Sequence, residues 1–233
     1  MYIINYDYKS KFDGGFMRFR IDLKIFLFLV VFYFTKQMEI YIIMIIFAII
    51  HELGHLICGL IIGLKPEKLE LMPTGLAISF KTNVDYYNKK IGRGNLFNFK
   101  KIIVAIAGPL TNLLMVVIFS FINIDYNLKL MIIYSNWLMF FFNLLPIYPL
   151  DGGRIVQEFL HIKMGINKSR DIVNDISMIV MIILTSVGSI GILYYKNIAI
   201  FFIIIYLWIL VINENIKFMR RKKLLKDVSN YLG

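Results

Sequence analysis

Residues 40–63 read IYIIMIIFAIIHELGHLICGLIIG, an apolar run long enough to cross a bilayer, with His51, Glu52 and His55 in its middle. Polar side chains inside hydrocarbon are costly, so three of them in one apolar segment indicate a functional site. Residues four apart project from the same face of a helix, so the two imidazoles can share a zinc ion. The glutamate stands beside them as a candidate general base, which is the role that this spacing gives it.

The rest of the chain is equally apolar. Of the 233 residues 59% are hydrophobic and the mean hydropathy is +0.71, with the apolar residues gathered in long blocks. A soluble protein would need polar surface on its helices, so lipid is the expected solvent. We therefore predict an all-α polytopic membrane protein with about six transmembrane helices, near residues 21–35, 40–62, 102–122, 129–149, 174–195 and 197–213.

The charge distribution predicts the orientation and the domain organisation. Only Lys36, Lys129 and Lys196 of the 26 basic residues fall in the three turns on one side, so both termini are expected in the cytoplasm. The predicted parts are a cytoplasmic segment 1–20, a helical domain 21–213 and a basic cytoplasmic tail 214–233. The net charge of +11 is then explained by topology and by anionic lipids, with no nucleic-acid partner.

A hydrolytic zinc site needs a third protein ligand and one open position. Residues 143–154, NLLPIYPLDGGR, offer Asp151, which we expect to close the fourth span where Pro146 and Pro149 interrupt the helix. Backbone freed at membrane depth is tolerated only inside protein or beside a wet cavity, and a membrane hydrolase requires such a cavity.

Two further segments suggest local structure. Residues 67–80 alternate partially around Pro73 and Gly75, which predicts a small membrane-associated β-hairpin loop, although an ordinary surface loop also fits. Gly108 and Pro109 would loosen the third span so that Asn112 points inward, or would simply kink it. Gly54 favours close helix packing.

Three blocks in this order carry a family resemblance. They are HELGH at 51–55, AGPLTN at 107–112, and Asn143-x-x-Pro146 leading to Leu-Asp-Gly at 150–152. Together they resemble the site-2 protease family of intramembrane zinc metalloproteases, over most of residues 20–213. Residues 143–154 and the compact six-span layout are most similar to its sporulation branch. Members of that branch often carry a CBS domain after the last span, for which the roughly twenty remaining residues leave no room, and residues 63–101 leave no room for a PDZ domain.

The resemblance implies a site and a mechanism. Zn²⁺ would be held by His51, His55 and Asp151, while Glu52 would take a proton from the attacking water and return it to the leaving amine. Asn143, Asn112 and Pro146 would contact the substrate. A lone membrane asparagine such as Asn143 can equally bond a neighbouring helix. The edge of the hairpin at 67–80 would pair with the extended substrate.

The resemblance also implies partners. We expect a membrane-associated protein substrate, with a sporulation sigma-factor precursor as first choice, and an inhibitory membrane protein, in the bacterial cell membrane or the membrane around the forespore. One alternative is a housekeeping site-2 protease that cleaves anti-sigma factors, signal-peptide remnants or pheromone precursors. An alternative of another class is a membrane metal carrier or transporter, which would have no need for Glu52 beside the first ligand.

Overall fold

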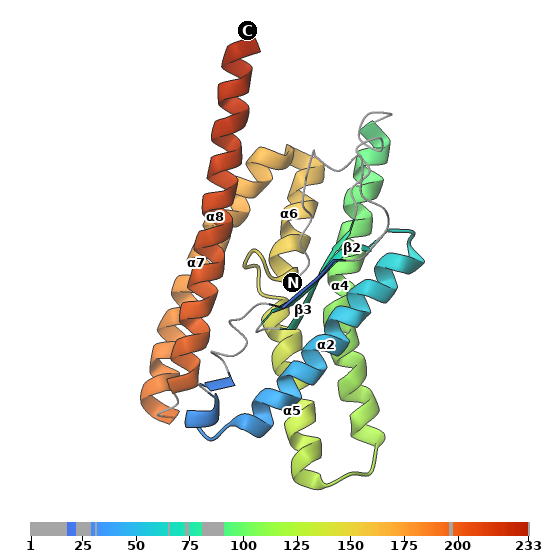
Figure 1. The fold of residues 1–233 in the computed structure, drawn as a ribbon, viewed down its shortest axis with the longest axis vertical. Helices are drawn as coiled ribbons and strands as arrows, with labels where there is room; N and C mark the ends of the chain where they lie inside the picture. Colours follow the sequence, from blue (N-terminus) through green and yellow to red (C-terminus); the bar gives the residue numbers. More distant parts are fainter. Residues whose placement is uncertain are drawn as a thin grey trace. The chain divides into compact units, whose positions relative to one another are not determined.

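The computed structural model describes residues 18–21, 29–30, 32–64, 66–72, 75–80, 91–195 and 198–232. The chain divides into two compact units, Met1–Leu144 and Leu145–Gly233, and each is described by itself. The first unit contains β1 (Arg18–Ile21), α2 (Met38–Ile61), β2 (Pro66–Met72), β3 (Gly75–Phe80), α4 (Ile91–Phe121) and α5 (Tyr126–Asn143). The second contains α6 (Asp151–Met164), α7 (Ile166–Tyr195) and α8 (Ile198–Leu232) (Figure 1).

Three helices form the body of the first unit. Helices α2, α4 and α5 pack against one another in every pairing. Their shared core is apolar and consists of Ile43, Phe47, Ala48, Ile132 and Met139. The opposite faces expose large apolar side chains, such as Ile57 on α2 and Leu110 on α4, as expected where lipid is the solvent. The chain thus buries the face that carries His51 and leaves the other face for hydrocarbon.

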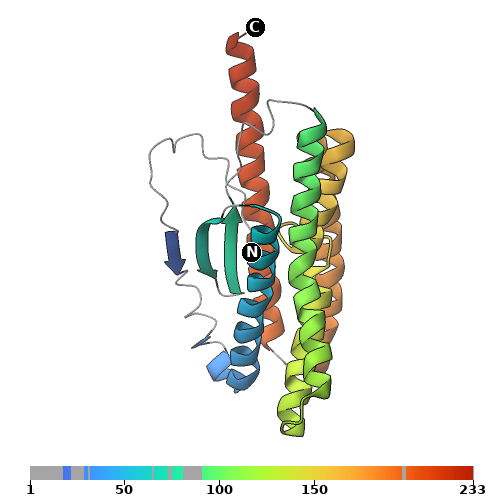
Figure 2. The same cartoon turned by 90° about the vertical axis from the view of Figure 1, so that its right-hand side faces the viewer.

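A small sheet accompanies these helices. Strand β2 pairs antiparallel with β3, with Leu69 opposite Ile78, and parallel with β1, in the order β1-β2-β3. Strand β3 also packs against α2, beside which the sheet is seen in Figure 2. The β2–β3 pair lies in the segment where a hairpin was predicted, whereas β1 was not foreseen. The depth of the hairpin at the membrane surface stays a prediction.

Four of the six predicted spans coincide with long apolar helices of the structure, and the count of six stays a prediction. Within the described ranges four helices are long and apolar enough to cross a membrane: Met38–Ile61, Asn95–Phe121, Ile166–Tyr194 and Ile200–Leu224. The predicted span 129–149 corresponds to α5, which ends at Asn143 and is diluted by polar residues such as Asn127, Lys129 and Asn136. Most of the predicted span 21–35 lies outside the described residues, and Ile21 belongs to β1.

The second unit is a chain of three helices in which α7 packs against both α6 and α8. Asp151 is the first residue of α6, so it begins a helix instead of closing the fourth span. Residues 145–150 form the preceding loop, because Pro146 and Pro149 cannot continue regular helix hydrogen bonding. Helix α8 continues through the predicted tail to Leu232, since Lys, Arg and Leu are strong helix formers.

Candidate metal centre

His51, Glu52 and His55 gather on the buried side of α2. Their side chains are 3%, 6% and 1% exposed, and one candidate ligand atom from each lies within 4.8 Å of the other two. The four-residue spacing of the histidines stacks them on one face of the helix, as the sequence predicted. Three polar groups are therefore collected in a segment whose other residues are almost all apolar, at the place where α2 meets α4.

The two imidazoles turn the same nitrogen toward each other. His51 Nε2 and His55 Nε2 are 3.1 Å apart, and the ring planes are nearly perpendicular at 87°. Two nitrogens bound to one tetrahedral zinc at about 2.0–2.1 Å would be roughly 3.3–3.4 Å apart. The observed separation is close to that value, so the pair can bind one ion with a small adjustment of the side chains.

A backbone carbonyl fixes the proton of His55. His55 Nδ1 lies 2.6 Å from the carbonyl oxygen of Val104 in α4. A carbonyl can only accept, so Nδ1 must carry the hydrogen and donate it, although the amide of Gly108 also approaches Nδ1 at 3.2 Å. The lone pair of His55 is then on Nε2, on the side of His51. A carbonyl partner on the far nitrogen is the usual support of a metal-binding histidine.

Asn112 supplies the corresponding partner to His51. It is fully buried in α4, and its Nδ2 lies 3.0 Å from His51 Nδ1. In this orientation Asn112 donates, so His51 Nε2 carries the hydrogen and donates to His55 Nε2. If the amide turns by 180°, Oδ1, which has no hydrogen-bond partner among the described residues, accepts from Nδ1 and leaves Nε2 bare for a metal. The side chain thus suits both the metal-free and the metal-bound histidine.

Gly108 lets the backbone of α4 lie directly against the two histidines. A Cβ atom at this position would lie 2.3 Å from His55 Nε2 and 2.6 Å from His51 Nε2. Both Nε2 atoms are therefore packed against the backbone of α4, at a position where only glycine fits. Helix α4 continues through Pro109, and Asn112 lies on the face toward α2, where it meets His51.

Gly54 brings α2 and α4 together at the same level. A Cβ there would lie 2.0 Å from Thr111 Oγ1 and 3.2 Å from the carbonyl oxygen of Ala107. This contact is the close helix packing that the sequence suggested, and it brings the backbone of α4 near enough for Val104 to reach His55.

The remaining predicted residues lie at the end of α5, in the loop 145–150 and at the start of α6. Asn143 is the last residue of α5, and its Nδ2 donates to the carbonyl oxygen of Met139 in the same helix at 3.0 Å. Pro146 lies in the loop of the second unit, and Asp151, 5% exposed, is the first residue of α6. The partner role of Val104 was not predicted from the sequence, since a backbone carbonyl leaves no trace in residue type. The close contact of Gly108 with the two rings was not predicted either.

The first unit therefore carries a buried two-histidine metal centre with an adjacent glutamate, in a helix of membrane length. Comparisons with known proteins agree with this class. Residues 121–184 match the family model described as peptidase family M50. The chain is 33% identical over 156 residues to a zinc metalloprotease of Methanocaldococcus jannaschii, an alignment that covers 64% of this chain and 42% of that protein. The chain thus spans about two fifths of the length of this curated relative.

The fold is also similar to that of a solved protease. The structure of the site-2 protease from Methanocaldococcus jannaschii matches with a TM-score of 0.63 and 24% identity, over 86% of this chain and 92% of that chain. The family model, the curated relative and the shared fold thus all show similarity to proteases, and the four long apolar helices fit an integral membrane protein.

Proposed function

We propose that the chain is an intramembrane zinc endopeptidase that hydrolyses a peptide bond in or near a membrane-associated segment of another protein. The observation that carries this proposal is the pair of Nε2 atoms of His51 and His55, which lie 3.1 Å apart with Glu52 beside them. The curated relative of this chain is a zinc metalloprotease, and the family match points to the same chemistry.

The side chains have separate tasks in this proposal. His51 and His55 hold the zinc, with Asp151 as the third ligand, and Val104 and Asn112 fix the orientation of the two rings. A zinc ion held by these residues would supply the positive charge that polarises a scissile carbonyl and acidifies water. Glu52 accepts the proton of the attacking water on its carboxylate and delivers it to the nitrogen of the leaving amine.

The substrate and its surroundings are proposed on the sequence. Asn143, Asn112 and Pro146 would contact the substrate, although the burial of Asn112 against His51 also gives it a role in ligand support. The free edge of the sheet offers main-chain hydrogen bonds to an extended peptide. We propose a multi-pass location with cytoplasmic termini, on the distribution of basic residues.

The client protein is proposed on the stretch 143–154. Its similarity to the sporulation branch makes a sporulation sigma-factor precursor, kept in check by an inhibitory membrane protein, the first client to test. Co-production of the chain with such a precursor, followed by the mobility of the precursor on a gel, tests this choice. An intact precursor beside a cleaved anti-sigma factor, signal-peptide remnant or pheromone precursor would assign the housekeeping role instead.

The decisive experiment for the activity is Glu52→Gln. We expect the variant to retain zinc, measured by metal analysis of the purified protein, and to lose cleavage of a membrane-anchored test substrate. Glu39→Gln is the matched control, because Glu39 is exposed in the first turn of the same helix. Undiminished cleavage by Glu52→Gln would refute the protease. Zinc movement across vesicles that survives in Glu52→Gln would favour the metal carrier.

A further inference from the structure

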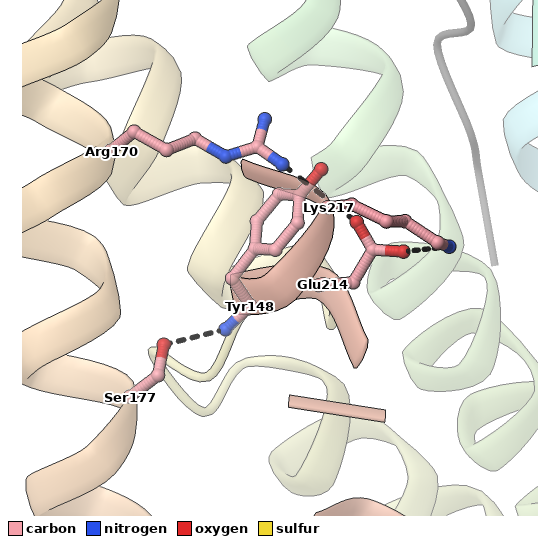
Figure 3. Close-up of polar contacts among 5 residues, drawn as sticks. All are labelled: Tyr148, Arg170, Ser177, Glu214 and Lys217. Carbon is pink, nitrogen blue, oxygen red and sulfur yellow. Dashed lines mark hydrogen bonds and ion pairs between the residues drawn. The ribbon is translucent and has the colours of Figure 1, made fainter. Parts of the chain in front are cut away.

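The loop that precedes Asp151 is held from the side by α7. The backbone N–H of Tyr148 donates to Ser177 Oγ at 2.8 Å, and the Ser177 hydroxyl donates in turn to the carbonyl oxygen of Val173 at 2.7 Å (Figure 3). Ser177 is 1% exposed. A serine buried in an apolar helix thus has both of its hydrogen-bonding functions used, and one of them fixes the backbone of the loop at Tyr148.

The ring of Tyr148 is held by a second group. The guanidinium of Arg170 lies 4.3 Å from the centroid of the Tyr148 ring, and it pairs with Glu214 of α8 at 3.7 Å. Lys217 also pairs with Glu214, at 2.7 Å. Figure 3 shows these side chains converging from α7, α8 and the loop. The arginine and the glutamate are only 17% and 14% exposed, so their attraction is screened less than that of a surface pair.

Backbone hydrogen bonds and a close contact connect the loop at Tyr148 to the first turn of α6. The amide of Leu150 donates to the carbonyl oxygen of Ile147 at 2.7 Å, and the amide of Arg154 donates to that of Leu150 at 3.1 Å. Gly153 packs so closely that a Cβ would lie 2.4 Å from Tyr148 N and from Ile147 C. Asp151 lies between these contacts, so it cannot move independently of the backbone at Ile147 and Tyr148.

We propose that Arg170 and Ser177 are positioning residues for Asp151. They act through Tyr148 and set the place of the carboxylate that the proposed function takes as the third zinc ligand. This inference rests on the proposed function, because it takes Asp151 as the third ligand. Its physical basis is that a metal ligand held within a narrow range by its supporting contacts binds more tightly than a ligand on a mobile loop.

A simpler role for Arg170 would be to join α7 to α8, and the second unit offers a control for that role. Lys222 of α8 pairs with Asp171 of α7 through both carboxylate oxygens, at 2.8 and 3.0 Å. This ion pair joins the same two helices one residue further along α7, but Asp171 and Lys222 have no described contact with Tyr148. Replacement of Lys222 therefore removes a link between α7 and α8 and leaves the loop contacts in place.

The test compares Arg170→Met, Ser177→Ala and the control Lys222→Met in the purified full chain. Zinc affinity is measured by competition with a chelator, and amide hydrogen exchange over residues 145–154 is measured in the metal-free protein. We expect the first two variants to weaken zinc binding by about 10-fold, in the range of outer-shell changes. We also expect them to accelerate exchange at Tyr148, Leu150 and Arg154. The control should change neither quantity.

A spectroscopic readout separates positioning from general loss of stability. With Co²⁺ in place of zinc, a displaced carboxylate alters the visible absorption bands, which report on the geometry of the ligands. We expect Arg170→Met and Ser177→Ala to alter these bands and Lys222→Met to leave them as in the parent. Arg170→Lys, which keeps the charge but loses the planar group over the ring, should remain impaired.

The outcomes distinguish this inference from the proposed function. If Asp151→Asn binds zinc as tightly as the parent, the proposed ligand set fails. If Asp151→Asn loses zinc but Arg170→Met and Ser177→Ala bind it like Lys222→Met, the positioning role alone is wrong. Should Arg170→Met fail to fold, Ser177→Ala decides, since it removes one hydroxyl and leaves the ion pairs intact.

Discussion

The metal centre of the first unit and the Tyr148–Arg170–Glu214 cluster of the second are both polar groups in mainly apolar helices, but they are built in opposite ways. At the centre, two histidine Nε2 atoms lie 3.1 Å apart and pack against Gly108 of the neighbouring helix. In the cluster, the side chains satisfy one another, since the arginine meets both a ring and a carboxylate. The first arrangement leaves coordination capacity for an ion, whereas the second uses its capacity to hold a loop.

Polar side chains in a membrane helix can serve either to hold neighbouring protein or to bind a ligand. A polar group in lipid must find a partner, and the partner can be protein or ligand. His51 and His55 have protein partners on their Nδ1 atoms and turn their Nε2 atoms to a common point. The convergence of two imidazoles and a carboxylate, more than the number of polar residues, marks the first cluster as a candidate binding site.

The largest expected effect comes from adding a side chain at Gly108. Gly108→Ala places a methyl group against both Nε2 atoms, so we expect zinc affinity to fall by more than the roughly 100-fold that outer-shell changes cause, with loss of cleavage. Chelator competition measures the affinity. Gly191→Ala is the control, because a Cβ there meets only Ile200 Cδ1 at an ordinary 3.9 Å. Normal zinc binding by Gly108→Ala would mean that the ion lies elsewhere.

A smaller effect is expected from the support of His51. Asn112→Leu removes the group that faces Nδ1, so zinc affinity should fall by about 10- to 100-fold. Asn112→Asp, which keeps an oxygen that accepts from Nδ1–H, should retain most of the affinity. Equal loss in both variants would indicate that Asn112 acts through packing and not through the proton on His51.

Much of the centre could be predicted from sequence. The pair His51 and His55 follows from helix periodicity, and Glu52 follows from adjacency along one helix. The contact of Val104 with His55 could not be predicted, because it depends on how closely α2 approaches α4 and involves a backbone atom. Gly108 was noticed, but its role needed the positions of two side chains from another helix.

The second unit was less predictable, for a different reason. The prolines of the loop were interpreted correctly as helix interruptions, yet the start of a new helix at Asp151 was not foreseen, because an acidic residue in the first turn is a weak signal by itself. The contact of Ser177 with Tyr148 joins positions 29 residues apart. A serine within an apolar run does require a partner, and that requirement was the available clue.

In the second unit, Gly153→Ala is expected to lower the stability of the metal-free protein. Gly153→Ala forces a Cβ against the backbone at Ile147 and Tyr148, and overpacking of this kind costs about 1–3 kcal/mol. Thermal unfolding of the metal-free protein should show a lower midpoint. Gly108→Ala provides the comparison. Its main effect should be on zinc affinity, with only a minor change in the unfolding midpoint of the metal-free protein. Equal midpoints for Gly153→Ala and the parent would contradict the close contact.

The smallest effect is expected at the end of α2. Lys100 Nζ donates to the carbonyl oxygen of Ile62 at 2.8 Å, which satisfies an acceptor that the helix leaves open. Lys100→Met should cost about 0.5–1.5 kcal/mol of unfolding free energy and leave zinc affinity unchanged. A denaturant titration measures the first quantity. A loss of zinc in this variant would show that the end of α2 and the centre are coupled.

The length of helix α8 has a mechanical consequence. Its 35 residues extend over about 52 Å at 1.5 Å per residue, whereas the hydrocarbon layer is about 30 Å thick. A length of roughly 20 Å therefore extends into water or the lipid headgroups as a rigid helix, and not as a flexible linker. A spin label at Leu224 should consequently tumble slowly and with a preferred axis, like a label on a rigid rod.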